Sequence, residues 1–182
     1  MLKMKDILDE KNPLLRKKSE EVIFPLSEED SKTIDLMIEF LTNSQIEEKA
    51  LKYDLRPGMG LAAIQLGIKK RYLTIVNEIG EEEFETFVVI NPKIVSTSQE
   101  MIYVDAGEGC LSVNRDVEGI VPRYARVTVE GYDKLGNKIK IRAREEVAIA
   151  FQHEIDHLNG ILFIDHIDKE NPFKDMDKYR AI

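Results

Sequence analysis

Residues 145–158 are predicted to form a helix with apolar side chains on more than one of its sides. The apolar positions that produce this pattern are Val147, Ile149, Ala150, Phe151 and Ile155. A helix with this pattern is buried, so other elements have to pack around it. Asn159-Gly160 follows in the manner of a C-cap, which places the end of the helix there.

Most of the other predicted elements are strands. Runs rich in strand-forming residues lie at 72–76, 87–90, near 93–104, 126–133 and 137–143, the last two as a hairpin. Asn91-Pro92 is expected to break the strand before it. One amphipathic helix is expected over 28–50, with Ser27 as its N-cap. Strands mixed with a few helices, without regular alternation, predict an α+β fold.

Length and charge limit the class of protein. The 182 residues fit a single domain, 1–182, with a C-terminal tail at about 169–182. The formal net charge is −8 and no block of Lys and Arg stands out, so direct DNA binding is not expected. The chain has one cysteine, no secretory signal and no membrane span of about 20 apolar residues. We therefore expect a cytoplasmic protein without membrane contact.

Two of the chain's three histidines, His153 and His157, stand four residues apart on the predicted helix. Residues at this spacing share a face, so both imidazoles can reach one metal ion. Glu154 follows the first histidine and can act as a general base beside that ion, as in the H-E-x-x-H motif. The alternative is a buried helix with two hydrogen-bonded histidines. Burying several ionisable groups is costly without compensation, which favours the metal site.

Two histidines need a third ligand. In the pattern H-E-x-x-H-x-x-G-x-x-H, Gly160 fits the glycine, but Phe163 stands at the last histidine. A glutamate from a later helix is a weak alternative, because Glu170 lies beside a proline near the end of the chain. The strongest remaining candidate is Cys110, which lies upstream.

Cys110 could instead be a buried apolar residue or a thiol nucleophile. Gly107 and Gly109 let the backbone beside it approach another group, and a thiolate is a good ligand for Zn²⁺ or Fe²⁺. A divalent ion with one thiolate, two neutral imidazoles and the ionised Glu154 carries a charge near zero. That balance suits a neutral substrate such as an amide.

The segment Gly58-Met59-Gly60-Leu61-Ala62-Ala63 fits the pattern G-x-G-x-x-A of dinucleotide-binding loops. Pro57 precedes it where a buried strand is needed, so nucleotide binding is not favoured. We expect a tight loop whose backbone pairs with an extended ligand, followed by Gln65 as a side-chain N–H donor.

Three motifs, GMGLAAIQ, EGCLS and HEIDH, occur in this order. They resemble the signature motifs of the peptide deformylases, G-x-G-L-A-A-x-Q, E-G-C-L-S and H-E-x-D-H, and their joint occurrence is highly specific. The resemblance runs from Asn12 to about residue 168 and is to the longer type seen in Gram-positive bacteria. Ile64 stands where the family usually has proline. Proline would stiffen the loop, so isoleucine is expected to loosen it slightly.

The resemblance implies a metal-dependent hydrolase that removes the N-formyl group from the N-terminal methionine of new polypeptides and releases formate. The fold would have antiparallel sheets packed around the central helix 145–158. One divalent ion, natively Fe²⁺ with Zn²⁺, Ni²⁺ or Co²⁺ as replacements, would be held by Cys110, His153 and His157. The protein would be a monomer that acts on N-formylmethionyl nascent peptides, with a transient ribosome contact.

The resemblance also implies roles for further residues. Catalysis would use Glu154 as general base and two donors to the oxyanion, the Gln65 amide and the Leu111 backbone N–H. The substrate would be bound by Met59, Gly60, Gly109 and, in the pocket for the methionine side chain, Ile149. Independently of the resemblance, Glu108 and Asp156 are expected to support the site or to form ion pairs, with Arg123 as the cationic partner. The alternative for all three is a surface position, and His166 is expected to be a surface histidine.

Three other functions stay open. A zinc endopeptidase would cleave internal peptide bonds and tolerate the loss of Cys110. A thiol-based redox or binding protein would need no metal. A degenerate relative would bind formylated peptides without turnover, which the intact Glu154 and Gln65 argue against.

Overall fold

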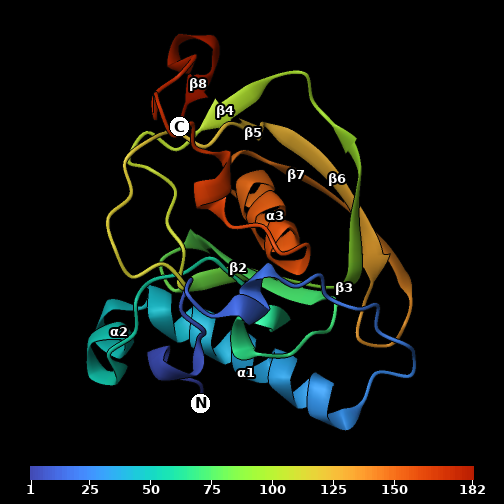
Figure 1. The fold of residues 1–182 in the computed structure, drawn as a ribbon. Helices are drawn as coiled ribbons and strands as arrows, with labels where there is room; N and C mark the ends of the chain where they lie inside the picture. The colour runs from blue at the N-terminus through green and yellow to red at the C-terminus, as the bar shows by residue number, and fades with distance from the viewer.

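A computed structural model describes residues 1–182 of the protein. The helix α3, Glu145–Leu158, runs through the middle of the molecule with strands on several sides (Figure 1). Ten of its 14 residues are buried, as the apolar pattern predicts. Its predicted bounds are confirmed: Asn159 is the C-cap, and Gly160 follows with φ 78°.

A five-stranded antiparallel sheet supplies most of the cover over α3. Its order is β1-β2-β3-β6-β7. The strands are β1 Gly60–Ala62, β2 Tyr72–Gly80, β3 Glu83–Thr97, β6 Arg126–Tyr132 and β7 Lys138–Arg144. The predicted hairpin is β6 and β7, paired in an unbroken register from Arg126↔Arg144 to Tyr132↔Lys138.

A second, smaller sheet has the order β5-β4-β8. Its strands are β4 Met101–Tyr103, β5 Arg123–Tyr124 and β8 Arg180–Ala181. β4 and β5 are antiparallel, whereas β8 runs parallel to β4 and comes from the predicted C-terminal tail. The α+β fold with mainly antiparallel sheets around one helix is confirmed.

The helix predicted over 28–50 is divided in two. α1 is Glu28–Gln45 and α2 is Glu47–Tyr53, with Ile46 between them in an extended conformation. The N-cap prediction is confirmed, because the Ser27 side chain accepts from the Asp30 N–H. Gln45 donates to two carbonyls outside the helix, at Gly58 and Val76, which ties the end of α1 to the sheet.

The prediction that Asn91-Pro92 ends a strand is wrong. β3 continues through both residues, with a register shift against β6 between Ile90 and Lys93. Asn91 has φ 52°, and its side chain makes two hydrogen bonds with the backbone of Val22. The pair therefore forms a bulge that bends one long strand.

Side chains of β2 alternate between two cores, because successive residues of a strand point to opposite faces. Leu73 and Ile75 pack in the core that includes Phe151 of α3, while Tyr72 and Val76 pack in the core with Phe40 of α1. α1 and α3 thus lie on opposite faces of β2. Five 3-10 turns complete the fold: Met4–Asp6, Pro13–Arg16, Ala63–Leu66, Phe163–His166 and Met176–Lys178.

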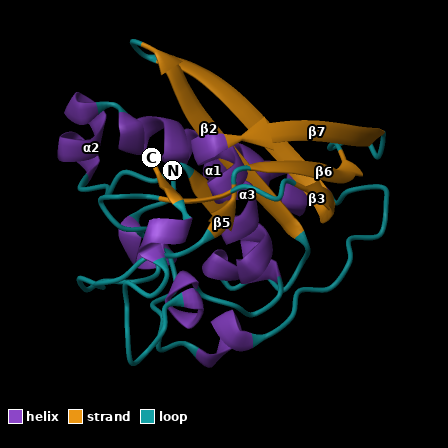
Figure 2. Ribbon diagram, turned by 90° about the horizontal axis from the view of Figure 1, so that it is seen from above, coloured by secondary structure: helices purple, strands orange, loops and turns teal.

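Figure 2 shows the strands gathered on one side of the molecule and much of the chain's loops and short turns on the other. The long connection between β4 and β5, which carries Cys110, runs in Figure 1 as a yellow loop across α3 from β6 and β7. No helix has both the length and the apolar character that a membrane crossing requires.

Candidate metal centre

Three predicted ligand atoms converge beside α3. The Cys110 Sγ lies 3.3 Å from the His157 Nε2, and that nitrogen lies 3.2 Å from the His153 Nε2. All three atoms lie within 4.8 Å of one another. The two histidines come from successive turns of α3, and Cys110 comes from a segment more than 40 residues earlier.

The spacing of these atoms fits a tetrahedral ion. Bonds of about 2.0–2.1 Å to nitrogen and 2.3 Å to sulfur place ligand atoms roughly 3.3–3.6 Å apart. The two short separations are close to that range. The buried Glu154 Oε2 beside this centre also has no hydrogen-bond partner. A buried polar atom without a partner is costly, and one thiolate with two imidazoles is a donor set that fits a bound cation.

The charges around the histidines favour a cation at the same place. Burial alone would lower the pKa of His153, but the Cys110 sulfur and the Glu108 carboxylate raise it well above its usual value. Burial and the charge on His153 lower the pKa of His157 well below its usual value. His153 is thus the ring that binds a proton more readily, and His157 the ring that stays neutral. A proton and a metal ion compete for such a cluster.

Glu108 fixes the orientation of His153. Its Oε1 lies 2.5 Å from the His153 Nδ1, so Nδ1 carries the hydrogen and Nε2 points toward Cys110 and His157. Burial raises the pKa of Glu108, but the hydrogen bonds and charges of His153 and Arg123 outweigh it and hold the pKa at about 2. Glu108 is therefore a carboxylate.

Arg123 joins this carboxylate to a second one. Its guanidinium donates to both oxygens of Glu108 and to Asp156, and its side chain is 4% exposed. Asp156 in turn contacts the Nε2 of His166 at 2.7 Å. The expected ion pairs are confirmed, and Arg123 is buried where a surface position was the alternative. The His166 side chain is 36% exposed and contacts Asp156, so it is not a fourth member of the Cys110, His153 and His157 cluster.

Glu154 follows His153 in α3 and is buried, with 4% of its surface exposed. Burial raises its pKa to about 7, with the charge on His153 opposing the rise. A carboxyl with this pKa can take and return a proton near neutral pH. Gly60 makes room for it, because a Cβ built on Gly60 would overlap the Glu154 carboxyl.

Gln65 and Leu111 flank the Cys110 sulfur. The Gln65 Oε1 accepts from the Ala62 N–H, which leaves its Nε2 pointing at the Ser112 hydroxyl (3.1 Å) and the Cys110 sulfur (3.8 Å). The side chain is thus fixed as an N–H donor at the edge of the centre. Leu111 packs its side chain against Gly58.

A pocket of about 560 Å³ opens onto this centre. Its wall contains all four residues expected to bind substrate and most of those expected to bind metal or act in catalysis: Met59, Gly60, Gly109, Ile149, Gln65, Leu111, Cys110, His153 and Glu154. His157 lies behind them, 1% exposed. The structure therefore brings every predicted site residue into one place.

Arg56 was missed by the sequence reasoning. It lines the pocket and donates to the Cys110 carbonyl at 2.7 Å, to the Val113 carbonyl and to the Asn114 side chain. The guanidinium ties the loop before β1 to the segment that carries Cys110. Nothing local in the sequence indicates this, because the partners are more than 50 residues away.

Comparison with known proteins decides the family. The model of the polypeptide deformylase family matches residues 4–173. The chain belongs to the peptide deformylase family. It is 52% identical over 173 residues to peptide deformylase 2 of Bacillus anthracis, with 95% of this chain and 94% of that protein covered. It is 51% identical over 182 residues to peptide deformylase 2 of Bacillus cereus, covering 100% and 99%.

Solved deformylase structures share the fold. A probable peptide deformylase from Synechococcus phage S-SSM7 has a TM-score of 0.72 at 37% identity, covering 88% of this chain and 98% of that one. The peptide deformylase of Thermus thermophilus has a TM-score of 0.74 at 30% identity, covering 91% and 86%. The resemblance read from the three motifs is confirmed, and the Bacillus relatives agree with the Gram-positive type.

Ile64 is the visible departure from the deformylase motif. It is fully buried in the core that α3 shares with the sheet. Its side chain packs in this core, and Gly60 and Gln65 on either side of it in the chain line the pocket.

Proposed function

We propose that this chain is a metal-dependent peptide deformylase, which hydrolyses the N-formyl group of new polypeptides to formate and a free N-terminal methionine. The observation that supports it is the convergence of Cys110, His153 and His157 beside the buried Glu154 at the end of one pocket. A peptide-sized opening that ends at a small ionic centre suits a short acyl group on a chain end.

Cys110, His153 and His157 would hold one divalent ion, natively Fe²⁺, with Zn²⁺, Ni²⁺ or Co²⁺ able to replace it. When bound, such an ion supplies Lewis acidity, which lowers the pKa of water and polarises a carbonyl. Glu108 keeps the His153 Nε2 aimed at the centre, and Arg123 keeps Glu108 ionised.

Glu154 would move the proton. Its carboxylate takes a proton from the attacking water and later gives it to the leaving amine, so the nitrogen departs as a neutral amine. Its buried position excludes bulk water from this transfer, and its raised pKa suits both directions.

The Gln65 amide and the Leu111 backbone N–H would donate to the oxygen that becomes negative. Gln65 is suited to this because its own oxygen is occupied by Ala62, which fixes the N–H side toward the centre. Removing one such donor typically costs about 10²–10³ in rate.

The peptide would lie along Met59, Gly60 and Gly109. Gly109 faces open space, so the substrate backbone can approach it closely. The methionine side chain would enter beside Ile149, and the formyl group would lie next to Glu154, which lines the same pocket.

Residues 1–182 would act as a single catalytic domain and as a monomer. Its substrates are nascent peptides, so we place the protein in the cytoplasm, with a transient contact to the ribosome. The location and the ribosome contact rest on where the substrate is made.

The direct test is formate release from a formyl-Met tripeptide by protein purified without oxygen. Glu154→Ala should keep its metal, measured by elemental analysis, and lose activity by about 10²–10⁴-fold, because a positioned general base contributes that much. Retained turnover in this variant would remove Glu154 from the mechanism.

A parallel assay separates the rival functions. Cleavage of internal peptide bonds with Cys110→Ala still active would indicate a zinc endopeptidase. Alkylation of Cys110 in the metal-loaded protein, with no metal requirement, would indicate a thiol-based protein. Binding of formylated peptides without formate release would indicate a degenerate relative.

A further inference from the structure

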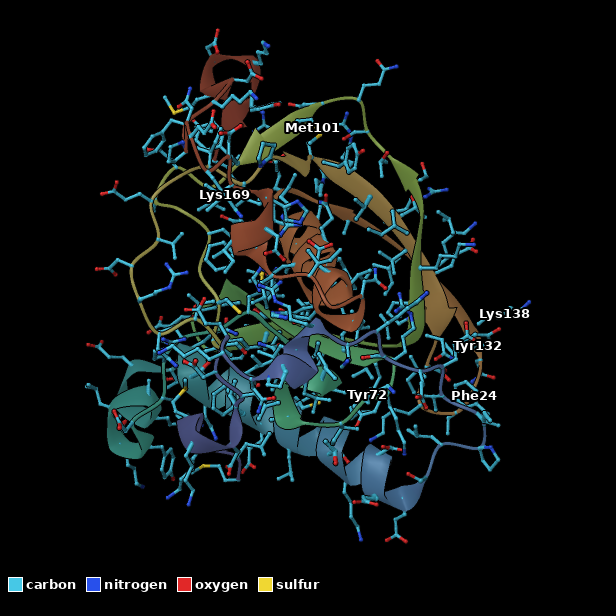
Figure 3. The ribbon with its side chains drawn as sticks, in the orientation of Figure 1. Phe24, Tyr72, Met101, Tyr132, Lys138 and Lys169 are labelled. Atoms are coloured by element: carbon cyan, nitrogen blue, oxygen red, sulfur yellow. The ribbon has the colours of Figure 1, made fainter.

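The outer face of β7 carries a row of cations. Its inward side chains, Ile139, Ile141 and Ala143, are partly or fully buried, so the alternate residues point outward. These outward residues are Lys138, Lys140, Arg142 and Arg144. β7 is the edge strand of the five-stranded sheet, and Figure 3 shows Lys138 at its outer margin.

The neighbouring strand adds to the charge. Arg126 of β6 stands directly opposite Arg144, and Thr128 stands opposite Arg142. Like charges that face each other across two strands destabilise a sheet. The arrangement therefore costs the fold stability instead of contributing to it.

Acidic partners balance only part of this row. Arg126 pairs with Glu100, and Lys140 pairs with Glu130. Arg142 and Arg144 take part in no ion pair and are exposed. Two guanidinium groups with all their donors free thus stand side by side on this face.

A groove of about 560 Å³ lies between these arginines and β3. Its wall combines three arginines with four hydroxyl side chains and two apolar residues: Ser96, Thr97, Ser98, Arg126, Val127, Thr128, Arg142, Ala143 and Arg144. Guanidinium groups flanked by hydroxyls bind phosphate oxygens well, because their forked donors match two oxygens at once.

We propose that this groove, which we call the β6–β7 groove, binds the phosphodiester backbone of RNA. The rest of a protein with net charge −8 repels a polyanion, so binding would be confined to this face. We choose RNA as the source of the phosphate because the proposed substrate is a peptide still being made on the ribosome. This choice rests on the proposed function.

Edge protection is the alternative reason for charge on β7. Charged side chains, lysine above all, are a common means of keeping an edge strand from pairing with another sheet. Protection does not require Arg126 opposite Arg144, nor the hydroxyl wall between them. A lipid surface is disfavoured too, because Val95 is only 44% exposed beside the groove, whereas Leu135, the most exposed apolar residue of the hairpin, lies at its tip, at the other end of β7.

The groove and the catalytic pocket are lined in part by residues that are near neighbours in the sequence. Arg144 is the N-cap of α3, and Glu146, two residues later, lines the pocket wall. RNA held at the groove would therefore place the enzyme near its substrate without covering the centre itself, whose residues are distinct from the groove's.

The test compares R142Q/R144Q with K17Q/K18Q. Each variant removes two exposed positive charges, and Lys17 and Lys18 make no ion pair, so net charge is matched. Binding of a fluorescent single-stranded RNA 20-mer is followed by anisotropy from about 50 to 200 mM salt, without formylated peptide. Because no turnover is involved, a failed deformylase assay and a failed RNA assay are separate results.

Wild-type protein should bind with a dissociation constant of roughly 10⁻⁴–10⁻⁶ M, and log affinity should fall linearly with log salt. R142Q/R144Q should bind at least tenfold more weakly at 50 mM salt, with a salt slope smaller by about 1.4, since each phosphate contact contributes about 0.7. K17Q/K18Q should match the wild type, and R142K/R144K should keep most of the slope.

Three results would overturn the proposal. The first is no RNA binding by the wild type. The second is equal loss of affinity in the two charge-matched variants. The third is sedimentation with vesicles of an anionic phospholipid at salt where RNA is not bound. Circular dichroism melting of each variant excludes misfolding as the cause of a lost signal.

Discussion

Glu108 holds the metal centre together from outside the ligand set. It accepts from His153 and from two nitrogens of Arg123, and its carboxylate is buried with them. A carboxylate that orients a ligating histidine typically contributes 10–100-fold to metal affinity.

Glu108→Gln should therefore weaken metal binding by about 10–100-fold, because the amide gives up one charge facing His153. Metal affinity is measured by competition with a coloured chelator at fixed pH. Glu118→Gln is the matched control, since Glu118 is exposed in the same segment between β4 and β5. Equal affinities in the two variants would show that Glu108 does not support His153.

At the scale of elements, Arg56 joins the loop before β1 to the Cys110 segment. Its guanidinium reaches three acceptors in that segment at once, which a lysine cannot do with the same geometry. The two walls of the pocket are thereby fixed relative to each other.

We expect Arg56→Lys to release the Cys110 segment. Loss of these hydrogen bonds should cost about 1–3 kcal/mol, with faster alkylation of Cys110 in metal-free protein. Arg115→Lys is the control, because Arg115 lies in the same segment and pairs with Glu10 on the surface. An unchanged alkylation rate in Arg56→Lys would mean that other contacts fix the segment.

Asp30 ties the start of α1 to the sheet. It accepts from Lys70 and from Tyr72, and its side chain is 5% exposed. Burial raises its pKa, but the hydrogen bonds of Lys70, Ser27 and Tyr72 outweigh this and lower it below the usual value. The folded state therefore binds the Asp30 proton less tightly than the unfolded chain does.

The stability that Asp30 contributes should be present above its unfolded pKa of about 3.9 and lost as pH falls through its lower folded pKa. Asp30→Asn should cost about 2 kcal/mol at pH 7, by urea unfolding, with the difference from wild type shrinking below pH 4. Glu28→Gln, which removes an exposed pair with Lys32, should change stability by less than about 0.5 kcal/mol. A difference that does not vary with pH would contradict the ionised Asp30.

At the scale of the whole molecule, the C-terminal segment supports the pocket from behind. β8 pairs with β4, and Ile182 exchanges backbone hydrogen bonds with Tyr103 and Asp105. The Ile182 side chain packs against a small core that contains Ile149, a residue of the pocket wall. β4 and the C-terminal residues 180–182 thus lie together next to the pocket wall at Ile149.

Deleting residues 180–182 should raise KM for a formyl-Met peptide by about 3–10-fold while leaving kcat within about twofold, because contacts to the side-chain pocket loosen and the metal centre does not. Steady-state kinetics on the deletion variant measure both constants. Arg180→Ala is the control, since it removes ion pairs with Glu100 and Glu145 but keeps β8 and Ile182. A fall in kcat alone would place the effect at the centre instead of the pocket.

The sequence by itself determined α3, the β6–β7 hairpin, the Ser27 cap and the set of chemical groups at the site. Each of these depends on neighbours within a few residues, such as the four-residue spacing of His153 and His157. It also indicated Cys110 as the missing ligand, because the other candidates for a third ligand failed and Gly107 and Gly109 lie beside it.

Only the tertiary structure decided the rest. The break at Ile46, the bulge at Asn91, the anchoring by Arg56 and the parallel strand β8 all depend on partners far away in the chain. The outward row of cations on β7 is visible as alternation in the sequence, but its meaning needs Arg126 opposite Arg144. The local sequence pattern determines which face of a helix or strand is apolar. Only the packing of the whole chain determines which distant residues each face contacts.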